Sequence, residues 1–495
     1  MRMPVADSDL VSRRAEFLGA LRKLVPGEGV IGTPEELAAY ECDGLTAYRQ
    51  PPLAVVLPGD TAQVAAVLAY CHSQGLKVVP RGSGTSLSGG ALPLADAIVL
   101  GLSKLNRVLE IDYANRCVIA QPGVTNLAIT QVVAERGFYY APDPSSQVAC
   151  SIGGNVAENS GGVHCLKYGM TTNNVLGVEM VLIDGSIVRL GGRVYDAPGY
   201  DLLGIVTGSE GLLGVVTEVT VRILPRPEHQ QALLIGFPSI EAAGSCVAAI
   251  IGNGLIPAGM EMMDRLAIHA AEAFVHAGYP LDVEALLIVE FDGPRAEIEE
   301  HVQIVRDLAA HCGADHLRIS GSERERLQFW AGRKAAFPAV GRVSPDYYCM
   351  DGTIPRHCLP QVLRRIRQMS QAYGLAVANV FHAGDGNLHP LILYDASQAD
   401  QLEKAERFGA EILTLCVEVG GVLTGEHGVG VEKRDLMEVQ FQPPDLEQQQ
   451  RLKCAFDADG LLNPGKVFPH LCRCAELGRV HVHAGALRFP DLPRF

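Results

Sequence analysis

The segment PDPSSQVACSIGGNVAENSGG at residues 142–162 constrains the fold more than any other part of this chain, because it concentrates proline, serine, asparagine and glycine. A stretch of this length without apolar periodicity is usually functional or disordered. Apolar segments bracket it on both sides, which favours a functional loop. Two other glycine-rich loops, at 78–90 and 207–214, lie in the same half of the chain. Together they can line an extended ligand that has a pyrophosphate at one end and a flat ring at the other.

The loop VVPRGSGTSLSGG at 78–90 directly follows a predicted strand. Because glycine has no Cβ, backbone N–H groups in such a loop can approach a phosphate closely. The spacing departs from the dinucleotide-binding fingerprint, since Leu87 stands where a third glycine should follow Gly82 and Gly84. Taken alone, this loop leaves phosphate binding and a plain turn equally open. The two other loops favour phosphate binding.

Hydrophobic patterning predicts mixed α and β structure in the first half of the chain. Asp184-Gly185 between two apolar runs is a strong hairpin signal. Alternating residues from Val215 to Ile223 predict a half-buried strand that ends near Pro225. Before them, a predicted strand, helix and strand cover 53–57, 60–74 and 76–80.

After residue 227, strand-like runs alternate with helical stretches. Units of this length predict an α+β domain with helices on one face of an antiparallel sheet. The predicted strands lie within 232–237, 286–291, 346–354 and 375–381, and the predicted helices cover 239–252, 294–312, 358–373 and 397–419. A chain of 495 residues exceeds the size of one hydrophobic core. We therefore expect four parts, at 1–227, 228–425, 426–470 and 471–495.

Composition argues against several classes of function. A formal charge of −15 argues against nucleic acid and against an anionic membrane surface as partners. No apolar run approaches the ~20 residues of a membrane span, and the N-terminal residues indicate an amphipathic helix, not a signal peptide. The 13 cysteines are scattered without a CxxCxxC run, which predicts reduced thiols and no iron–sulfur cluster. We expect a cytoplasmic protein that reaches the inner face of the cell membrane, if at all, through partner subunits.

The tail holds a dense group of potential metal ligands, namely His470, Cys472, Cys474, His481 and His483. Their spacing matches no familiar zinc finger. A structural zinc site therefore stays open beside the favoured interpretation, which is a solvent-facing or partner-binding tail.

The stretch FHAGDGNLHP at 381–390 carries two histidines around an Asp-Gly pair. If Asp385-Gly386 forms the centre of a tight hairpin turn, His382 lies directly opposite His389 on one face, with Cβ atoms about 4.5–5.5 Å apart. Two imidazoles at that separation can converge on one divalent cation. The alternative, two ordinary histidines at the ends of a turn, stays open at this point.

A third potential ligand lies in GGVLTGEHGVG, where Glu426 precedes His427. Adjacent side chains in an extended segment point in opposite directions, so one can bind a metal while the other faces a substrate. Two histidines and a carboxylate form an open metal site with room for a substrate. The competing interpretation pairs Glu426 with Lys433 or Arg434.

Several motifs in order carry a resemblance to a known family. PRGSGTSL, the PDPSS…IGGNVAENSGG segment and GSEGLLGVVTEV resemble the FAD domain of the vanillyl-alcohol-oxidase or PCMH-type flavoproteins. With WAGRKAAFPAVGR, DYYCMDGTIPR, FHAGDGNLHP, GGVLTGEHGVG and LNPGKVFP, residues 15–495 resemble the FAD-linked subunits of bacterial glycolate oxidases, kin of D-lactate and D-2-hydroxyglutarate dehydrogenases. The fold class implied is α+β. It combines a PCMH-type FAD-binding domain of two α+β subdomains, a substrate or cap domain with an antiparallel sheet, and a C-terminal helical segment that returns to the FAD domain.

The resemblance implies which residues bind FAD. The glycine-loop residues implied are Arg81, Gly82, Ser83, Gly84, Thr85, Ser86, Pro142, Ser145, Gly153, Gly154, Asn155, Asn159, Gly162, Glu210, Gly211, Val215, Val216 and, more loosely, Asn463. Members with covalent flavin place a histidine in the first glycine loop. This chain has none between Arg81 and Gly90, so the FAD is expected to be non-covalent.

The resemblance also implies the chemistry. His382, His389 and Glu426 match the metal ligands and His427 matches the general base, with zinc expected and manganese or iron as alternatives. A substrate carboxylate favours a guanidinium, and Arg333 matches the arginine that binds it. The substrate implied is a small (R)-2-hydroxy acid, glycolate before D-lactate. The partners implied are an iron–sulfur subunit and a second FAD-binding subunit. A transferase of the ether-lipid-synthase type and a non-catalytic flavin subunit stay open as alternatives.

Overall fold

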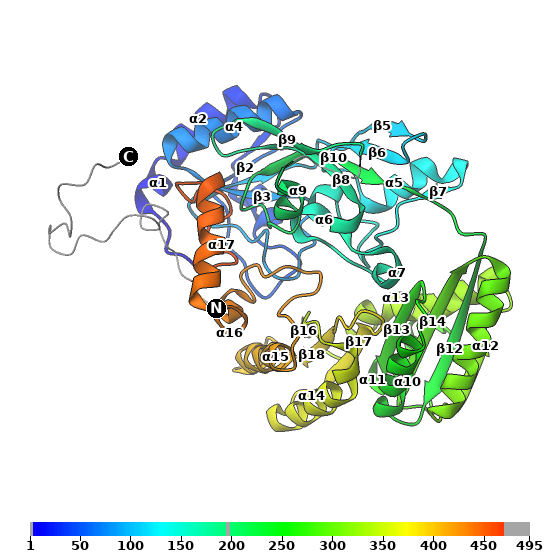
Figure 1. Cartoon of the computed structure of the whole chain (residues 1–495). Helices are drawn as coiled ribbons and strands as arrows, with labels where there is room; N and C mark the ends of the chain where they lie inside the picture. The colour runs from blue at the N-terminus through cyan, green and yellow to red at the C-terminus, as the bar shows by residue number, and fades with distance from the viewer. Residues whose placement is uncertain (1–2, 195–198, 470–495) are drawn as a thin grey trace, which may run out of the picture.

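The computed structural model describes residues 3–194 and 199–469. The tail residues His470, Cys472, Cys474, His481 and His483, and the predicted tail at 471–495, lie outside the described residues. Figure 1 shows an upper half built from the N-terminal elements and a lower half built around one large sheet, with helix α17 beside the first half.

The first sheet has four strands in the order β1-β2-β4-β3. Strands β2 and β3 both run parallel to β4, so the predicted strand, helix and strand are confirmed. Helix α4 starts after Asp60, whose carboxylate accepts a hydrogen bond from the Gln63 backbone, and ends at Gly75 in the left-handed conformation. The elements here are α1 (Ser8–Ser12), α2 (Arg14–Leu24), β1 (Val30–Ile31), α3 (Pro34–Leu37), β2 (Ala54–Val56), α4 (Thr61–Gln74), β3 (Lys77–Arg81) and β4 (Ala97–Gly101).

The second sheet has five strands in the order β5-β6-β10-β8-β9, all antiparallel. The predicted hairpin around Asp184-Gly185 is confirmed, with Val181 opposite Ile187. The elements here are β5 (Val108–Asp112), β6 (Cys117–Ala120), α5 (Asn126–Val133), β7 (Phe138–Tyr139), α6 (Ile152–Glu158), α7 (Cys165–Tyr168), α8 (Thr171–Asn174), β8 (Val175–Val181), β9 (Ile187–Gly191), α9 (Leu202–Val206), β10 (Val215–Arg222) and β11 (Leu224–Pro225).

One prediction for residues 142–162 is wrong, because helix α6 interrupts the expected continuous loop. Ser151 begins this helix, with its hydroxyl accepting a hydrogen bond from the Gly154 backbone. Asn159 ends it in the left-handed conformation. The two glycines within the helix weaken its sequence signal, and packing stabilises it, since Ile152 and Val156 lie in the core of the second sheet.

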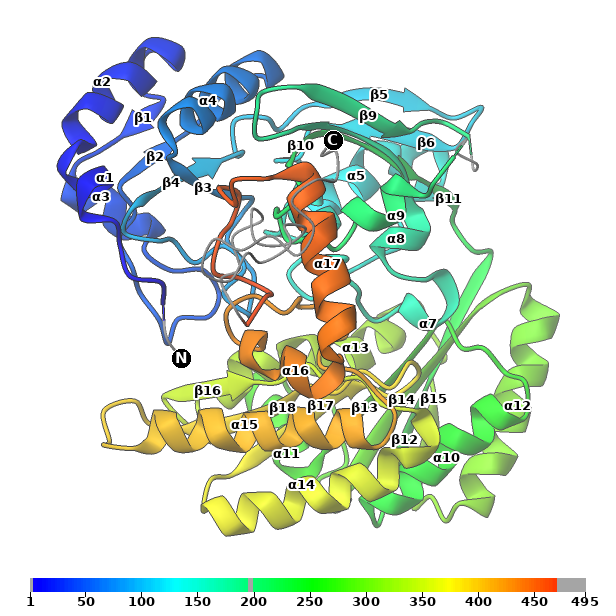
Figure 2. The same cartoon turned by 60° about the vertical axis from the view of Figure 1, so that its left-hand side comes forward.

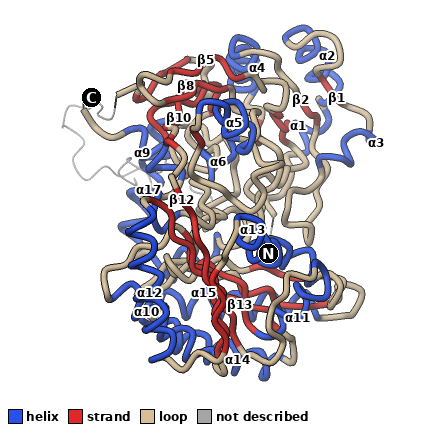
Figure 3. The backbone as a smooth tube through the Cα atoms, turned by 90° about the vertical axis from the view of Figure 1, so that its right-hand side faces the viewer, coloured by secondary structure: helices blue, strands red, loops and turns tan. Residues whose placement is uncertain are grey.

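The second half of the chain forms a seven-stranded antiparallel sheet, here called the cap sheet, in the order β15-β12-β14-β13-β17-β18-β16. Figure 3 shows its strands in red below the first half of the molecule. The strands are β12 (His229–Phe237), β13 (Gly259–Asp264), β14 (Ala285–Gly293), β15 (His316–Ile319), β16 (Asp346–Cys349), β17 (Val377–His382) and β18 (Pro390–Tyr394).

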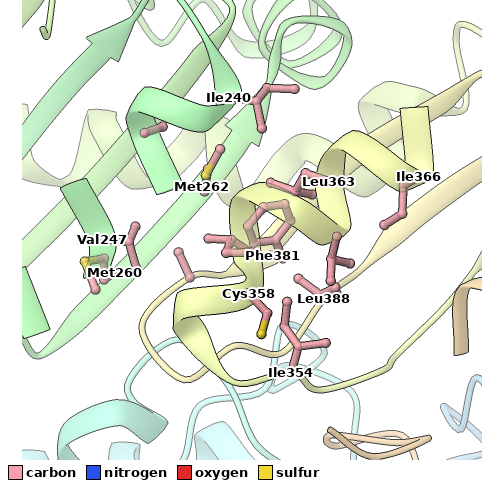
Figure 4. Packing of buried hydrophobic residues seen from close by; sticks show 14 of the residues in the cluster. Ile240, Val247, Met260, Met262, Ile354, Cys358, Leu363, Ile366, Phe381 and Leu388 are labelled. Atoms are coloured by element: carbon pink, nitrogen blue, oxygen red, sulfur yellow. The ribbon is translucent and has the colours of Figure 1, made fainter. Parts of the chain in front are cut away.

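Helices cover both faces of the cap sheet, which corrects the expectation of one covered face. The predicted helices pack on one face, where Figure 4 shows Phe381 beside Leu363 in the largest core. Two helices without a sequence prediction, α11 and α13, pack on the other face. Near-continuous apolar runs are typical of a sheet buried on both sides. The helices are α10 (Ile240–Gly252), α11 (Arg265–Val275), α12 (Arg295–His311), α13 (Glu323–Val340), α14 (Leu359–Tyr373) and α15 (Gln401–Glu418).

The C-terminal segment returns to the first half, as expected. Helices α16 (Met437–Gln440) and α17 (Pro443–Phe456) follow the cap sheet, and Figure 2 shows α17 running from the cap side toward the first sheet. Beyond α17 the chain pairs with β3, since the Val78 backbone N–H donates to Leu461 and its carbonyl accepts from Asn463. The buried Lys453 ammonium donates to the carbonyl oxygens of Leu212 and Leu462.

A half-buried histidine joins the two halves. His164, just before α7, contacts Asp143 through Nδ1 at 2.9 Å and Glu290 of the cap sheet through Nε2 at 3.5 Å. Glu290 also accepts from Arg326 and Trp330 of α13. Burial lowers the pKa of His164, but the two carboxylates outweigh this effect and raise the pKa to about 10. A charged imidazolium therefore holds the halves together at neutral pH.

We predict that His164→Gln flattens the dependence of stability on alkaline pH. The pKa of His164 is raised to about 10 in the folded protein, against about 6.5 in an unfolded chain. Its contribution is fully present below about pH 6.5 and is lost as the pH rises through about 10. Between pH 6 and pH 9 the free energy of unfolding should fall by at least ~1 kcal/mol more for the wild type than for the variant. Thermal unfolding at pH 6, 7.5 and 9 measures this fall. His269→Gln, at an exposed histidine, is the control, and parallel curves for wild type and His164→Gln contradict the prediction.

Candidate active site

The three glycine-rich loops line a cavity of about 480 Å³, and His389, Glu426 and His427 line it as well. It is called here the glycine-loop cavity. Most of the residues predicted to bind FAD line it, namely Arg81, Gly82, Ser83, Gly84, Thr85, Ser86, Ser145, Gly153, Gly154, Asn155, Glu210, Gly211, Val215 and Val216. The structure therefore brings distant loops together on one cavity, whose lining also contains three of the predicted reactive groups.

The loops approach each other so closely that side chains would collide. A Cβ on Gly82 would lie 2.3 Å from the Ser151 hydroxyl, and one on Gly153 would lie 2.5 Å from the Pro122 side chain. Hydroxyl groups of the first and second loops line the same cavity. Small residues with free backbone N–H groups suit a pyrophosphate, so the residues present fit a dinucleotide such as FAD.

Four residues predicted to bind FAD lie outside the lining of this cavity. Pro142 accepts a hydrogen bond from Asn126, and Asn159 accepts one from the Thr172 backbone. A Cβ on Gly162 would lie 2.5 Å from the Asp143 carbonyl group. Asn463 donates to the carbonyl oxygens of Gly90 and Glu210. These residues contact the loops or the residues next to them. Their contact with a cofactor stays a prediction.

His382, His389 and Glu426 come together as a His-His-Glu cluster. The Glu426 Oε1 atom lies 3.2 Å from Nε2 of His382 and 3.0 Å from Nε2 of His389. One donor atom from each residue lies within 4.8 Å of the others, and both histidines are buried. Two imidazole nitrogens and a carboxylate are a normal ligand set for a divalent cation such as zinc, so these residues fit the predicted metal.

The hairpin that positions the two histidines differs from its prediction by two residues. His382 pairs with Asn387 and not with His389, so residues 383–386 form a four-residue turn. The Gly386 backbone donates to the His382 carbonyl, and Asp385 accepts from the Asn387 backbone. Because side chains alternate with a period of two, a shift of two residues keeps both imidazoles on the same face. Their ring centroids lie 5.0 Å apart.

Asp351, which sequence reasoning missed, organises the loop that carries Glu426 and His427. Its carboxylate accepts from the backbone N–H groups of both residues, and the buried Lys433 ammonium lies 3.2 Å away. Burial raises the pKa of Asp351, but neighbouring positive charge, including that of Lys433, outweighs this effect. The pKa of Asp351 is therefore held well below its usual range. Lys433 thus pairs with Asp351, and Arg434 with Asp435, while Glu426 faces the histidines.

Burial and charge set the protonation of the cluster. Burial raises the pKa of Glu426, but His382 and His389 outweigh this effect and lower the pKa well below its usual range. Burial lowers the pKa of His427 to about 4, with Asp351 opposing the change. His427 is therefore neutral at pH 7 and stacks on His389, with ring centroids 5.0 Å apart. A neutral imidazole at the end of the glycine-loop cavity can accept a proton.

Arg333 lies beside the cavity and not in its lining. It is 2% exposed on α13, and its Nε atom donates to Glu261 at 2.6 Å. The next residue, Lys334, is exposed and lines the cavity with Phe337 of the same helix. Neither Glu261 nor Asp351 was identified as a site residue from the sequence. The role of Glu261 depends on which strand lies beside β13, which the sequence does not state.

Comparisons with known proteins assign the class. Residues 52–191 match the FAD binding domain, and residues 226–467 match the C-terminal domain of FAD linked oxidases. p-Cresol methylhydroxylase, solved with substrate bound, has a TM-score of 0.77 to this chain at 16% identity, over 93% of this chain and 97% of that one. The fold and the glycine-loop cavity define an FAD-linked oxidoreductase with a PCMH-type FAD-binding domain.

The sequence relatives identify the family within that class. Glycolate oxidase subunit GlcD of Escherichia coli (strain K12) is 56% identical over 97% of each chain. D-lactate dehydrogenase of Archaeoglobus fulgidus is 33% identical over 83% of this chain and 90% of that one. The chain belongs to the FAD-linked oxidase family that contains these two proteins, which confirms the resemblance stated from its motifs.

We predict that Asp351→Asn destabilises the protein and weakens the binding of the metal expected at the cluster. The substitution removes the carboxylate 3.2 Å from the buried Lys433, leaving Glu432 at 3.5 Å, and turns an amide donor toward the backbone N–H groups of the loop. Removing one partner of a buried ion pair costs ~3–5 kcal/mol. Thermal unfolding and zinc content should both fall. Asp346→Asn, on strand β16 of the same segment, is the control, and a variant with wild-type stability and zinc content contradicts the prediction.

Proposed function

We propose that this protein oxidises small (R)-2-hydroxy acids, with glycolate as the preferred substrate and D-lactate as the second. The observation that carries the proposal is the position of His427, which stacks on His389 of the His-His-Glu cluster and lines a cavity that fits FAD. When bound, FAD would accept a hydride and the metal would polarise the substrate hydroxyl. The names of the two relatives support the same substrate class.

His427 has the properties of the base that this oxidation needs. Removing a hydride from carbon also requires removal of the hydroxyl proton. Burial keeps the pKa of His427 at about 4, so its lone pair is available throughout the neutral range. Its Nδ1 atom is buried and has no hydrogen-bond partner among residues 3–194 and 199–469. The backbone N–H of His427 donates to Asp351, which holds this part of the loop beside the cavity.

The substrate carboxylate is proposed to bind near helix α13. Arg333 lies in ion-pair contact with Glu261, but within the described part of the chain its Nη2 atom makes no aligned hydrogen bond. Lys334, one residue later, adds a positive charge at the cavity. A guanidinium suits bidentate binding of a carboxylate, and we assign that role to Arg333.

The remaining assignments concern the metal and the partners. Zinc is proposed for the His-His-Glu cluster, with manganese or iron as alternatives, because its donor set suits each of them. FAD is proposed to be non-covalent. Electrons are proposed to leave through an iron–sulfur subunit beside a second FAD-binding subunit, supported by the printed name of the GlcD relative as an oxidase subunit. No helix among the described residues is long and apolar enough to span a bilayer, so association with a membrane is proposed to go through partners.

We predict that His427→Gln lowers the rate of flavin reduction by glycolate ~10²–10⁴-fold, because a positioned base contributes that much. Anaerobic mixing of holoenzyme with glycolate, followed through the flavin absorbance, measures the rate. FAD and zinc content should stay at wild-type levels. His357→Gln, at an exposed histidine, serves as the control.

Two results would count against this function. A wild-type flavin that no 2-hydroxy acid bleaches would favour a transferase of the same fold. A His427→Gln variant with the wild-type rate would favour a subunit that only relays electrons.

A further inference from the structure

A buried carboxylate stands next to the His-His-Glu cluster without belonging to it. Glu261 lies on β13, in the middle of the cap sheet, and is 1% exposed. Its neighbours on either side in the strand are Met260 and Met262. A buried charge is costly unless it is paired and hydrogen-bonded. A specific partner must therefore account for this glutamate.

Strand register provides that partner. Strands β13 and β17 are antiparallel, and Glu261 lies directly opposite His382. The Glu261 Oε1 atom lies 2.6 Å from Nδ1 of His382, and the other oxygen accepts from Nε of Arg333 at 2.6 Å. The two oxygens thus contact one residue of the predicted metal site and the residue assigned to the substrate carboxylate.

The geometry of the imidazole separates Glu261 from the ligand set. The two ring nitrogens point in different directions, and Nε2 of His382 faces Glu426 while Nδ1 faces Glu261. A cation bound between His382, His389 and Glu426 would therefore have Glu261 behind the ring. In that place a carboxylate accepts the Nδ1 proton, selects the tautomer with a free Nε2 lone pair, and makes that lone pair more basic.

We propose that Glu261 is a positioning residue that sets the metal ligand His382 and the carboxylate-binding Arg333 with one side chain. The inference rests on the proposed function, since it assumes a metal at the His-His-Glu cluster. Both contacts come from rigid elements, a central strand and helix α13, so the spacing between metal and guanidinium is built into the cap sheet.

Glu290 offers a matched control within the same sheet. It lies on the neighbouring strand β14, is fully buried, and contacts a histidine, His164, and an arginine, Arg326. His164 faces Asp143 and is no member of the cluster. Glu261→Gln and Glu290→Gln therefore remove the same charge from equally buried sites, and only the first touches the predicted metal site.

The test measures zinc binding by competition with a chelator on FAD-loaded protein, with elemental analysis of zinc per flavin. Glu261→Gln is expected to weaken zinc binding ~10–100-fold, the usual effect of losing a partner behind a ligand. Glu261→Asp keeps the charge, so its zinc affinity is expected to fall less than that of Glu261→Gln. Glu290→Gln should stay within about threefold of the wild type, as a change with no shared partner does. FAD content and thermal unfolding of the zinc-free proteins show whether each variant folds.

A kinetic measurement tests the second contact. With zinc saturating, Glu261→Gln is expected to raise the KM for glycolate about tenfold, because Arg333 loses the carboxylate that orients it. The Glu290→Gln variant should keep the wild-type KM. Zinc binding and KM that are both unchanged in a folded Glu261→Gln overturn this inference and leave the proposed function standing. A wild-type protein that binds no divalent metal overturns the metal site itself, and the role of Glu261 falls with it.

Discussion

The contact between Glu426 and the imidazoles of His382 and His389 is the interaction on which the arrangement of the whole site depends. The histidines belong to a hairpin of the cap sheet, whereas Glu426 belongs to the segment that returns to the first half of the chain. A carboxylate shared by two buried histidines therefore joins the cap sheet to the C-terminal segment. Two of these residues, His389 and Glu426, also line the glycine-loop cavity.

Buried charge recurs around this contact, and three buried carboxylates there are paired. Asp351 faces Lys433 and backbone donors, Glu261 faces a histidine and an arginine, and Glu290 repeats that pattern on the next strand. Unpaired, such groups would destabilise the sheet by several kcal/mol. When they are paired, these groups fix the orientation of the side chains that they contact, because a short hydrogen bond constrains both distance and direction. The cap sheet therefore serves both as a hydrophobic core and as a rigid frame for polar groups.

Sequence reasoning succeeded where local pattern and motif order carry the information. The hairpin around Asp184-Gly185 and helix α4 follow from neighbouring residues, and the structure confirms both. The structure also brings the three residues of the His-His-Glu cluster together, although the turn between the histidines is centred on Gly384-Asp385 instead of Asp385-Gly386. The face was right because a shift of two residues preserves alternation. Helix α6 was missed because its glycines conceal a helix that packing stabilises.

The sequence by itself determined the class of this protein, since the glycine loops, the order of the motifs and the ligand types are all written in neighbouring residues. Tertiary structure alone decided which carboxylates support the site. Glu261 meets His382 only through strand register, Asp351 meets Glu426 only through the returning segment, and His164 meets Glu290 only where the two halves touch. A buried glutamate in a methionine-rich strand has no local signal for its partner, because that partner lies far away in the chain and arrives only on folding.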